Sequence, residues 1–555
     1  MANHDDKPIK RFFQLIRPEA SEIRLIFLFS LVTGAFSLAL PLAVNSFVNT
    51  LGFGIQTMPF MQMLAVLLVV LLAALGFSGV LRIAQYFIIE IIQRRLFVRL
   101  ASDLAERLPR VNPITYGKHD GPELVNRFFE ITLIQKTTSV LFLQGLNLLL
   151  SATVGVIVLS FYHPFLLAFV IVTAGVLAAI IFLGGRRGVP TAIDESDAKY
   201  GVIAWIEQLA SFPRMFKFDA AKKYAIDRTD KSVERYLEAR RSHFRILIRQ
   251  IGMLISVEIL ASVALLGIGG SLVLSQQLTL GQLVAAELIL ATILSSIAKL
   301  GKQFEAWYDT MAAMNKLGYL IDLKPEPNEG DLEPFSPDAA SAVEAHGICY
   351  RFKDGTLPFE PVSLKVPCGA KHAIFAKDGS GQSTCFELLS GMRPPEDGAV
   401  HIGGRRLATW HPQQLHSELM LLRDVQIFEG TLRENLCFGR EDISGHDIER
   451  CLRLTGLTRF LTTHPKGLQT EIMNQGKNLS SGERIRLLVS RALLQQPSIL
   501  MVDDTLEKLA PEDRLELAQL LCAHDWTLII GTQDPAVHAL CSGITELNAP
   551  HLSNA

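Results

Sequence analysis

The stretch Asn478–Asp504, NLSSGERIRLLVSRALLQQPSILMVDD, decides the fold class of this chain. Its middle part has apolar residues at helical spacing, and the unbroken apolar run SILMV at 498–502 then ends in Asp503 and Asp504. Similar short apolar runs alternate with helical patterns from about residue 343 onward. This alternation is typical of an α/β domain.

A second apolar run, KHAIF at 371–375, leads into the glycine-rich segment Ala376–Thr384, AKDGSGQST. Such a loop between a strand and a helix can hold phosphate, because glycines let several backbone N–H groups converge on an anion at the helix N-terminus. The usual pattern is GxxxxGK[ST]. Here Ala376 stands at the first glycine and Gln382 at the lysine, so a plain glycine-rich turn remains the alternative for this segment alone. The residues that fit the pattern are Gly379, Gly381 and Ser383.

Hydrophobic residues make up 49% of the 555 residues and charged residues only 19%, which is too apolar for an ordinary soluble enzyme. The apolar residues concentrate before about residue 300, in six blocks that are each long enough to cross the ~30 Å hydrocarbon core as a helix. These blocks exclude a soluble P-loop enzyme. They lie at about 23–50, 60–92, 137–161, 164–185, 246–274 and 281–299.

Lys and Arg are distributed unevenly around these blocks. None occurs at 49–81, 150–185 or 250–298, which contain the three predicted outer turns, whereas the loops 94–136 and 186–245 carry many. Because positive loops stay on the cytoplasmic side, we expect both termini and the C-terminal domain in the cytoplasm and the spans in a cell inner (plasma) membrane. The formal net charge of -2 argues against nucleic acid as a partner.

The two long loops have helical apolar spacing, which predicts that spans two to five extend into the cytoplasm as helices. A segment rich in Pro, Asp, Glu and Ser then predicts a linker. The expected organisation is a transmembrane domain at 1–322, a linker at 323–342 and an α/β domain at 343–555. All seven cysteines lie in this last domain without a CxxC pair, which indicates a reduced intracellular domain without a zinc module.

Residues 478–504 resemble the signature motif, following helix and Walker B strand of ABC transporters, whose usual forms are LSGGQ and four apolar residues before Asp-Glu. Six spans with long cytoplasmic loops before such a domain resemble one half of an ABC exporter of the type IV fold. The segment Gly121–Ile131, GPELVNRFFEI, is similar to the first intracellular loop of bacterial exporters of this group. The resemblance implies a multi-domain membrane protein: a six-helix transmembrane domain with cytoplasmic helical extensions, followed by an α/β P-loop NTPase (ABC) domain.

The resemblance also implies ATP and Mg²⁺ as cofactors and assigns residues to them. Phe352 matches the aromatic that stacks on adenine, and Ser383 and Asp503 match the two magnesium positions, with the oxygen donors that this metal prefers. The phosphate-loop candidates are Gly379, Ser380, Gly381, Gln382, Ser383 and Thr384. The signature candidates, which in the family reach the ATP of the other subunit, are Leu479, Ser480, Ser481, Gly482 and Glu483.

Several family positions depart from the pattern, and the resemblance implies weak or absent hydrolysis at the chain's own phosphate loop. Gln382 replaces the phosphate-gripping lysine, and Asp504 replaces the glutamate that activates water, one methylene shorter. Gln533 stands at the γ-phosphate histidine and Arg423 at the magnesium-sensing glutamine, where a guanidinium cannot ligate a metal. Nucleotide could still bind, with Arg423 or Lys377 supplying positive charge. The alternatives are a surface ion pair of Arg423 and a solvated Lys377.

The departures spare the signature loop, which favours pairing with a competent second half-transporter over a homodimer. A non-hydrolysing regulatory or scaffold subunit is the alternative. In the membrane half, Glu258 lies near the middle of the fifth span, where it could line the transport path and favour a cationic group. A protonated or interhelically bonded Glu258 is the other interpretation, and the substrate is not identified by these residues.

Overall fold

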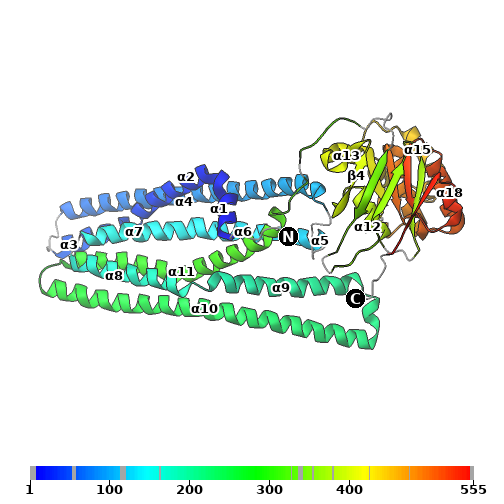
Figure 1. Cartoon of the computed structure of the whole chain (residues 1–555). Coiled ribbons are helices and arrows are strands. Elements are labelled where there is room, and N and C mark those ends of the chain that lie inside the picture. The colour runs from blue at the N-terminus through cyan, green and yellow to red at the C-terminus, as the bar shows by residue number, and fades with distance from the viewer. Residues whose placement is uncertain are drawn as a thin grey trace. The chain divides into compact units, whose positions relative to one another are not determined.

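The computed structural model describes residues 8–549 except 53–57, 113–120, 162–163, 327, 335–341, 353–354, 378–380, 424–425 and 474–475. The chain divides into two compact units, with the main boundary between Lys324 and Pro325; a short segment at 112–114 is assigned to the second unit. The first unit is helical and the second contains all of the described strands (Figure 1).

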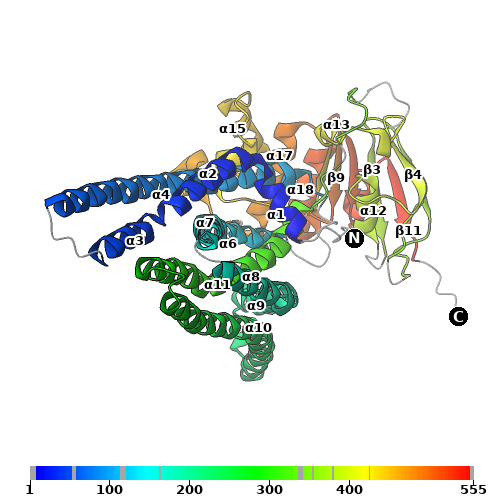
Figure 2. The ribbon, with the colours of Figure 1, turned by 90° about the vertical axis from the view of Figure 1, so that its left-hand side faces the viewer.

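Long helices make up the first unit. The helix α10 has 56 residues, about 84 Å at about 1.5 Å per residue, so it is far longer than a bilayer core of ~30 Å. It lies beside α9 and α11 in both views (Figures 1 and 2). The helices are α1 Pro8–Ile16, α2 Ala20–Phe36, α3 Ala39–Gly52, α4 Met58–Arg107, α5 Gly121–Asn126, α6 Glu130–Ser139, α7 Leu146–Ser160, α8 Pro164–Ala179, α9 Gly188–Ser211, α10 Asp219–Leu274 and α11 Leu280–Ile321.

Two π-helical segments interrupt this helical unit. The segment η5, Val140–Gly145, joins α6 to α7, and η6, Ile180–Gly184, follows α8. The last helix of the unit, α11, begins with a regular capping box, in which the side chains of Thr279 and Gln282 each accept a hydrogen bond from the backbone N–H of the other residue.

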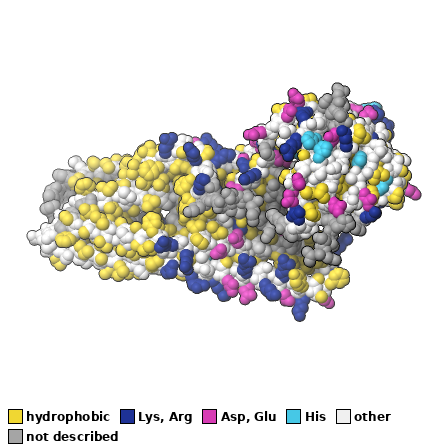
Figure 3. Space-filling model, viewed as in Figure 1, with side chains coloured by type: hydrophobic (Ala, Val, Ile, Leu, Met, Phe, Trp, Pro, Cys, Tyr) yellow, Lys and Arg dark blue, Asp and Glu magenta, His cyan; other side chains and the backbone are white. Residues whose placement is uncertain are grey.

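The surface of the first unit is apolar over a long stretch. Leu72 is 75% exposed, Val172 66% and Leu260 69%, and Figure 3 shows hydrophobic side chains gathered over this stretch and charged ones further along the helices. A continuous apolar surface of this size needs lipid or a partner to cover it. Within the described residues, five helical stretches are long and apolar enough to cross a membrane. The start of α11, Leu280–Ile293, is a shorter apolar stretch, which agrees with six spans.

A five-stranded parallel sheet, in the order β11-β3-β10-β9-β6, forms the centre of the second unit. A four-stranded antiparallel sheet, β2-β1-β4-β5, and the pair β7-β8 lie elsewhere in the same unit. The strands are β1 Val343–Cys349, β2 Val362–Val366, β3 Lys371–Ala376, β4 Asp397–Ile402, β5 Arg405–Arg406, β6 Leu419–Leu422, β7 Gly430–Thr431, β8 Glu471–Ile472, β9 Ile499–Asp503, β10 Thr527–Gly531 and β11 Gly543–Leu547.

The parallel sheet is buried on both faces, which explains the unbroken apolar runs in the sequence. Along β9, Met501 packs into the core that contains α12, while Leu500 and Val502 pack into the core that contains α17 and α18. The helices of this unit are α12 Gln382–Leu389, α13 Pro412–Glu418, α14 Leu432–Cys437, α15 Gly445–Leu454, α16 Thr458–Thr463, α17 Ser481–Gln495, α18 Pro511–Cys522 and α19 Pro535–His538.

Candidate nucleotide site

The carboxyl ends of four parallel strands bring the candidate residues together. Strand β3 leads to Gln382, β6 to Arg423, β9 to Asp503 and Asp504, and β10 to Gln533. Parallel strands end at one edge of their sheet, and this edge is the usual ligand position in open α/β sheets. Two of the phosphate-loop candidates, Gly379 and Ser380, lie outside the described residues.

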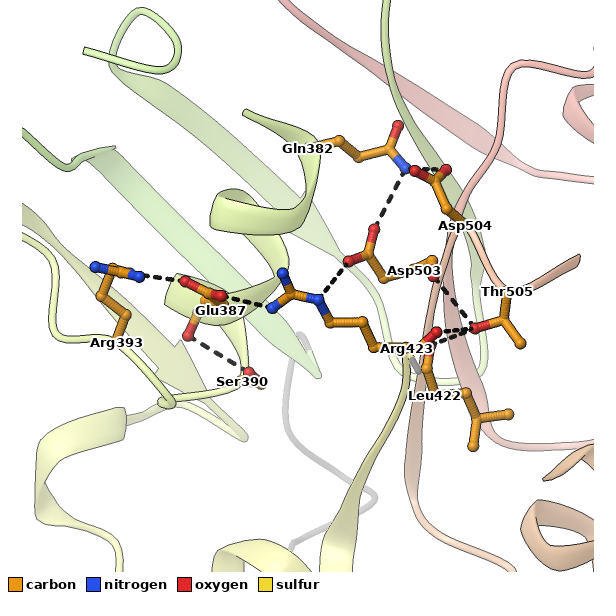
Figure 4. A network of polar contacts seen from close by, with 9 residues as sticks. All are labelled: Gln382, Glu387, Ser390, Arg393, Leu422, Arg423, Asp503, Asp504 and Thr505. Atoms are coloured by element: carbon orange, nitrogen blue, oxygen red, sulfur yellow. Dashed lines mark hydrogen bonds and ion pairs between the residues drawn. The ribbon is translucent and has the colours of Figure 1, made fainter. Parts of the chain in front are cut away.

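Gln382 is buried rather than extended toward a ligand. Its side chain is 1% exposed, and its amide donates to Asp504 Oδ1 at 2.7 Å and to Asp503 Oδ1 at 3.5 Å (Figure 4). Gly531 at the end of β10 leaves the space for it, because a Cβ there would lie 2.4 Å from Gln382 Nε2. The residue at the usual lysine position therefore links the first helix of the domain to the end of β9.

Gly381 fixes the entry to α12. Its φ is +82°, and an added Cβ would lie 2.6 Å from Phe359 Cδ1 and 2.8 Å from the carbonyl oxygen of Pro358. Both the backbone conformation and the lack of space require glycine. The next candidates, Ser383 and Thr384, lie half-buried in the first turn of α12.

Arg423 is the centre of a charged network. Its Nη1 donates to Glu387 Oε1 at 2.5 Å, and its Nε lies 3.4 Å from Asp503 Oδ2 (Figure 4). Glu387, on α12, also accepts from Arg393 Nε at 2.7 Å. Burial alone would raise the pKa of Glu387, but the hydrogen bonds from Arg423 and Arg393 outweigh burial and hold this pKa below its usual range.

The backbone of Arg423 is held as well. The Thr505 hydroxyl lies 3.0 Å from both the Leu422 and the Arg423 carbonyl oxygens. Neither Glu387 nor Arg393 was found by sequence reasoning. The only signal for Glu387 is a carboxylate four residues after Ser383, which looks like an ordinary helical residue, since its partner Arg423 lies 36 positions away.

Asp504 has an unusual backbone conformation with φ +49°. Aspartate tolerates this left-handed region better than most residues because its short polar side chain can bond locally. Burial raises the pKa of Asp504, although the hydrogen bond from Gln382 opposes the rise. The carboxylate is thus engaged inside the domain, with Gln382 as its partner.

The remaining phosphate-side candidates lie at the rim. Gln533 is exposed, and its amide donates to the carbonyl oxygen of Ala376 at 3.4 Å. Its backbone N–H donates to Glu507, a further carboxylate that the sequence analysis did not single out. Lys377 keeps 78% of its side chain exposed and pairs with Glu546 at 2.7 Å, so it lies at the surface, as its solvated alternative expects.

Phe352 lies beside the same charged network rather than apart from it. Its ring makes an edge contact with Tyr350 at 5.3 Å between centroids. The guanidinium of Arg393 lies 4.4 Å from the Tyr350 ring centre and 5.6 Å from that of Phe352. A cation over these rings is favourable and leaves Arg393 in position to hold Glu387.

The signature candidates form a regular helix start. Ser480 caps α17 in a capping box with Glu483, with backbone-to-side-chain distances of 2.7 and 3.2 Å. Leu479 is buried in the adjoining core, whereas Ser480 and Ser481 are exposed. Gly482 lies in the first turn. The loop therefore presents hydroxyls and a helix N-terminus on the surface, which is the arrangement that favours an anion.

The magnesium candidates do not fit a metal site as they stand. Ser383 and Asp503 supply suitable oxygen atoms. However, the Arg423 guanidinium lies against the Asp503 carboxylate, where a divalent cation would have to approach. Two cations at one carboxylate repel each other. We therefore assign no step of the chemistry to Mg²⁺.

In the other unit, Glu258 lies half-buried on α10. Its neighbours on the helix, Leu254 and Ala261, are buried against the helical core, while Ile259 and Leu260 are exposed. This position is compatible with either expectation for Glu258.

Comparisons with known proteins agree with this architecture. Residues 359–507 match the family described as "ABC transporter", which implies ATP binding, typically with Mg²⁺, and residues 23–297 match "ABC transporter transmembrane region". The ABC multidrug transporter mdr2 of Aspergillus fumigatus is 24% identical over 536 residues, which is 93% of this chain and 66% of that protein. The ATP-dependent lipid A-core flippase of Desulfotalea psychrophila is 21% identical over 521 residues, 92% of this chain and 89% of that protein.

A solved bacterial Atm1-family ABC exporter with ATP bound has the same fold, with a TM-score of 0.81 and 20% identity over 96% of this chain and 94% of that one. The expected fold class, a helical membrane domain followed by an α/β ATP-binding domain, is confirmed. The chain spans less than two thirds of the length of some curated relatives, as with the Aspergillus protein at 66%.

Proposed function

Since this chain belongs to the ABC transporter family, with a transmembrane region and an ATP-binding domain in one polypeptide, we propose that it is one half of an ATP-dependent exporter that pairs with a different half. Its relatives include proteins named as a multidrug transporter and as a lipid flippase, which supports export. The distribution of Lys and Arg supports a cell inner membrane with the ATP-binding domain in the cytoplasm.

The groups that should face the nucleotide are paired with one another, and this observation supports a degenerate ATP site. Gln382 bonds to Asp504, and Arg423 lies between Glu387 and Asp503. A nucleotide and its metal would have to break these contacts or bind around them. Hydrolysis at this phosphate loop is therefore weak or absent, and magnesium binding is weakened, while the bound nucleotide keeps a structural role.

The exposed signature loop supports pairing with a different half-transporter. In the family, this loop completes the ATP site of the other subunit, and here Ser480 and Ser481 are exposed at a well-capped helix start. Paired with a competent half, the chain would complete one good site and leave its own site degenerate. Paired with itself, it would form two degenerate sites.

Affinity purification of the full chain from native membranes tests this proposal. We expect a second ABC half to co-purify and the complex to hydrolyse ATP. Asp504→Asn in this chain should leave that hydrolysis nearly unchanged, whereas Ser481→Arg, which blocks the signature loop, should abolish it. A homodimer with substantial ATPase activity that Asp504→Asn destroys would overturn the proposal.

The same network also favours a second candidate, a non-hydrolysing regulatory or scaffold subunit. Asp504 and Glu387 already accept hydrogen bonds inside the domain, so the fold of this unit does not depend on nucleotide turnover. The purification separates the two: a complex without a second ABC half and without ATPase activity supports the scaffold.

A further inference from the structure

A pocket of about 440 Å³ opens within the first unit, and its lining does not include Glu258. Aromatic side chains dominate its lining, with Phe182 on one side and Phe304 and Trp307 of α11 on another. Among the described residues of the lining, Arg186 is the cationic side chain and none carries a carboxylate. A concave, mainly apolar site with a few polar groups is the usual form of a small-molecule site, and 440 Å³ lies in the usual range.

Both π-helical segments contribute to this pocket, η5 through Leu141 and η6 through Ile181 and Phe182. A π-helical turn is rare and occurs mostly at functional sites, since it widens the helix and re-aims its side chains. Gly145, the last residue of η5, makes room here: a Cβ would lie 3.1 Å from Gln303 Oε1.

Gln303 is the residue that points to a ligand. It is 6% exposed and lines the pocket, yet neither its amide nitrogen nor its amide oxygen has a hydrogen-bond partner among the residues that the structure describes. A buried amide that lacks both partners is strongly disfavoured. A bound molecule with an oxygen that accepts from the amide nitrogen would satisfy its donor side.

The pocket lies where the apolar spans give way to cationic residues. The apolar part of α11 covers Leu280–Ile293. Lys302 comes directly before Gln303, and Lys299 comes one helical turn earlier. Arg186 and Arg187 follow the end of η6 after one glycine, Gly185. Such a transition marks the level of the lipid headgroups on the cytoplasmic side.

We propose that this pocket binds an anionic amphiphile with an acyl-like apolar body. The apolar body packs against Phe182, Phe304 and Trp307, Gln303 bonds to the polar junction, and Arg186 pairs with the anionic group. This names a ligand class for the exporter proposed above, and it rests on that proposal only for transport, not for binding.

Fluorescence quenching by a brominated fatty acid tests the binding directly. The full chain is placed in phosphatidylcholine nanodiscs without ATP or partner and titrated with 9,10-dibromostearic acid. We expect saturable quenching, and a Trp307→Phe variant should lose the saturable part. Because no nucleotide or second subunit is present, saturable quenching would still show binding even if no second ABC half co-purifies. In the same way, a lack of quenching would leave the proposed pairing of two halves untouched.

Two substitutions separate specific binding from partition into lipid. Arg186→Gln should weaken the apparent affinity for the acid at least about fivefold and leave the neutral methyl ester unchanged. Arg187→Gln is the matched control, since Arg187 is exposed and outside the lining, and it should behave like the natural chain. Gln303→Leu, which keeps the volume, should weaken both probes. Equal quenching in the Arg186→Gln and Arg187→Gln variants, or saturable quenching that survives Trp307→Phe, would overturn the proposal.

Discussion

Replacing Arg423 by glutamine restores the usual family residue and removes the guanidinium from Asp503. The lost contacts include the 2.5 Å hydrogen bond to Glu387 and the 3.4 Å approach to Asp503. Arg423 keeps 34% of its side chain exposed, whereas Glu387 keeps 10%. A charge-assisted bond of this partly exposed kind contributes about 1–2 kcal/mol. The variant should therefore unfold about 2–8 °C earlier.

The same change should create a metal site. A divalent ion about 2.1 Å from the Asp503 oxygen would lie about 5 Å from the guanidinium nitrogen of Arg423. The repulsion between charges of +2 and +1 at this distance is between about 2 and about 7 kcal/mol, for effective dielectric constants of about 80 and 20. Its removal should strengthen metal binding at least about tenfold.

Electron paramagnetic resonance of Mn²⁺ measures this directly on the purified full chain without nucleotide, since free ATP would itself bind Mn²⁺. We expect weak binding in the natural chain and at least about tenfold tighter binding in Arg423→Gln. Arg406→Gln, at an exposed arginine of β5, is the matched control and should not change Mn²⁺ affinity. Equal Mn²⁺ affinity in the natural chain and in Arg423→Gln would refute the idea that the guanidinium excludes the metal.

Three further outcomes are expected. Gly381→Ala should destabilise the second unit by more than about 1 kcal/mol, because φ is +82° and a Cβ would meet Phe359. Gly445→Ala is the control, since a Cβ at Gly445 would lie in open space. Urea unfolding of both variants measures the difference in stability. Ser480→Ala removes the cap of α17 and should cost about 1 kcal/mol in the same assay, and retained stability would contradict the capping role. The pKa of Glu387 is lowered in the folded state, so ionised Glu387 stabilises the fold above the usual carboxyl pKa range. This stabilisation is lost as the pH falls through the lowered pKa. Glu387→Gln should therefore make the free energy of unfolding less dependent on pH in the acid range.

Much of the fold was predictable because it follows from unbroken apolar runs. The run at 498–502 forms β9, buried on both faces, and the run at 371–375 forms most of β3. The apolar blocks before residue 300 likewise form helices, since lipid-exposed backbone must be bonded internally. The π-helical segments were not predictable, because 140–145 and 180–184 have the same apolar composition as the α-helices beside them.

The candidate site was predictable in its members but not in their contacts. Strand ends bring Gln382, Arg423 and Asp503 to one edge, as expected for any parallel sheet. That Arg423 turns to Glu387 depends on the geometry between the end of β6 and α12, which no local pattern encodes. The expectation of a surface ion pair for Arg423 had the right interaction type, but Glu387 and Asp503 are both largely buried.

The contacts also change how the family departures relate to one another. As a list of residues they look like separate losses, but in the structure Gln382 bonds to Asp504, Arg423 approaches Asp503, and Thr505 holds the backbone of Arg423. Residues in one network do not contribute independently. A lysine introduced at position 382 would meet Asp504, which is one methylene shorter than the usual glutamate, and Arg423, which already lies at the metal position. Single restorations should therefore leave hydrolysis weak, because each restored group still faces a partner that suits the altered network.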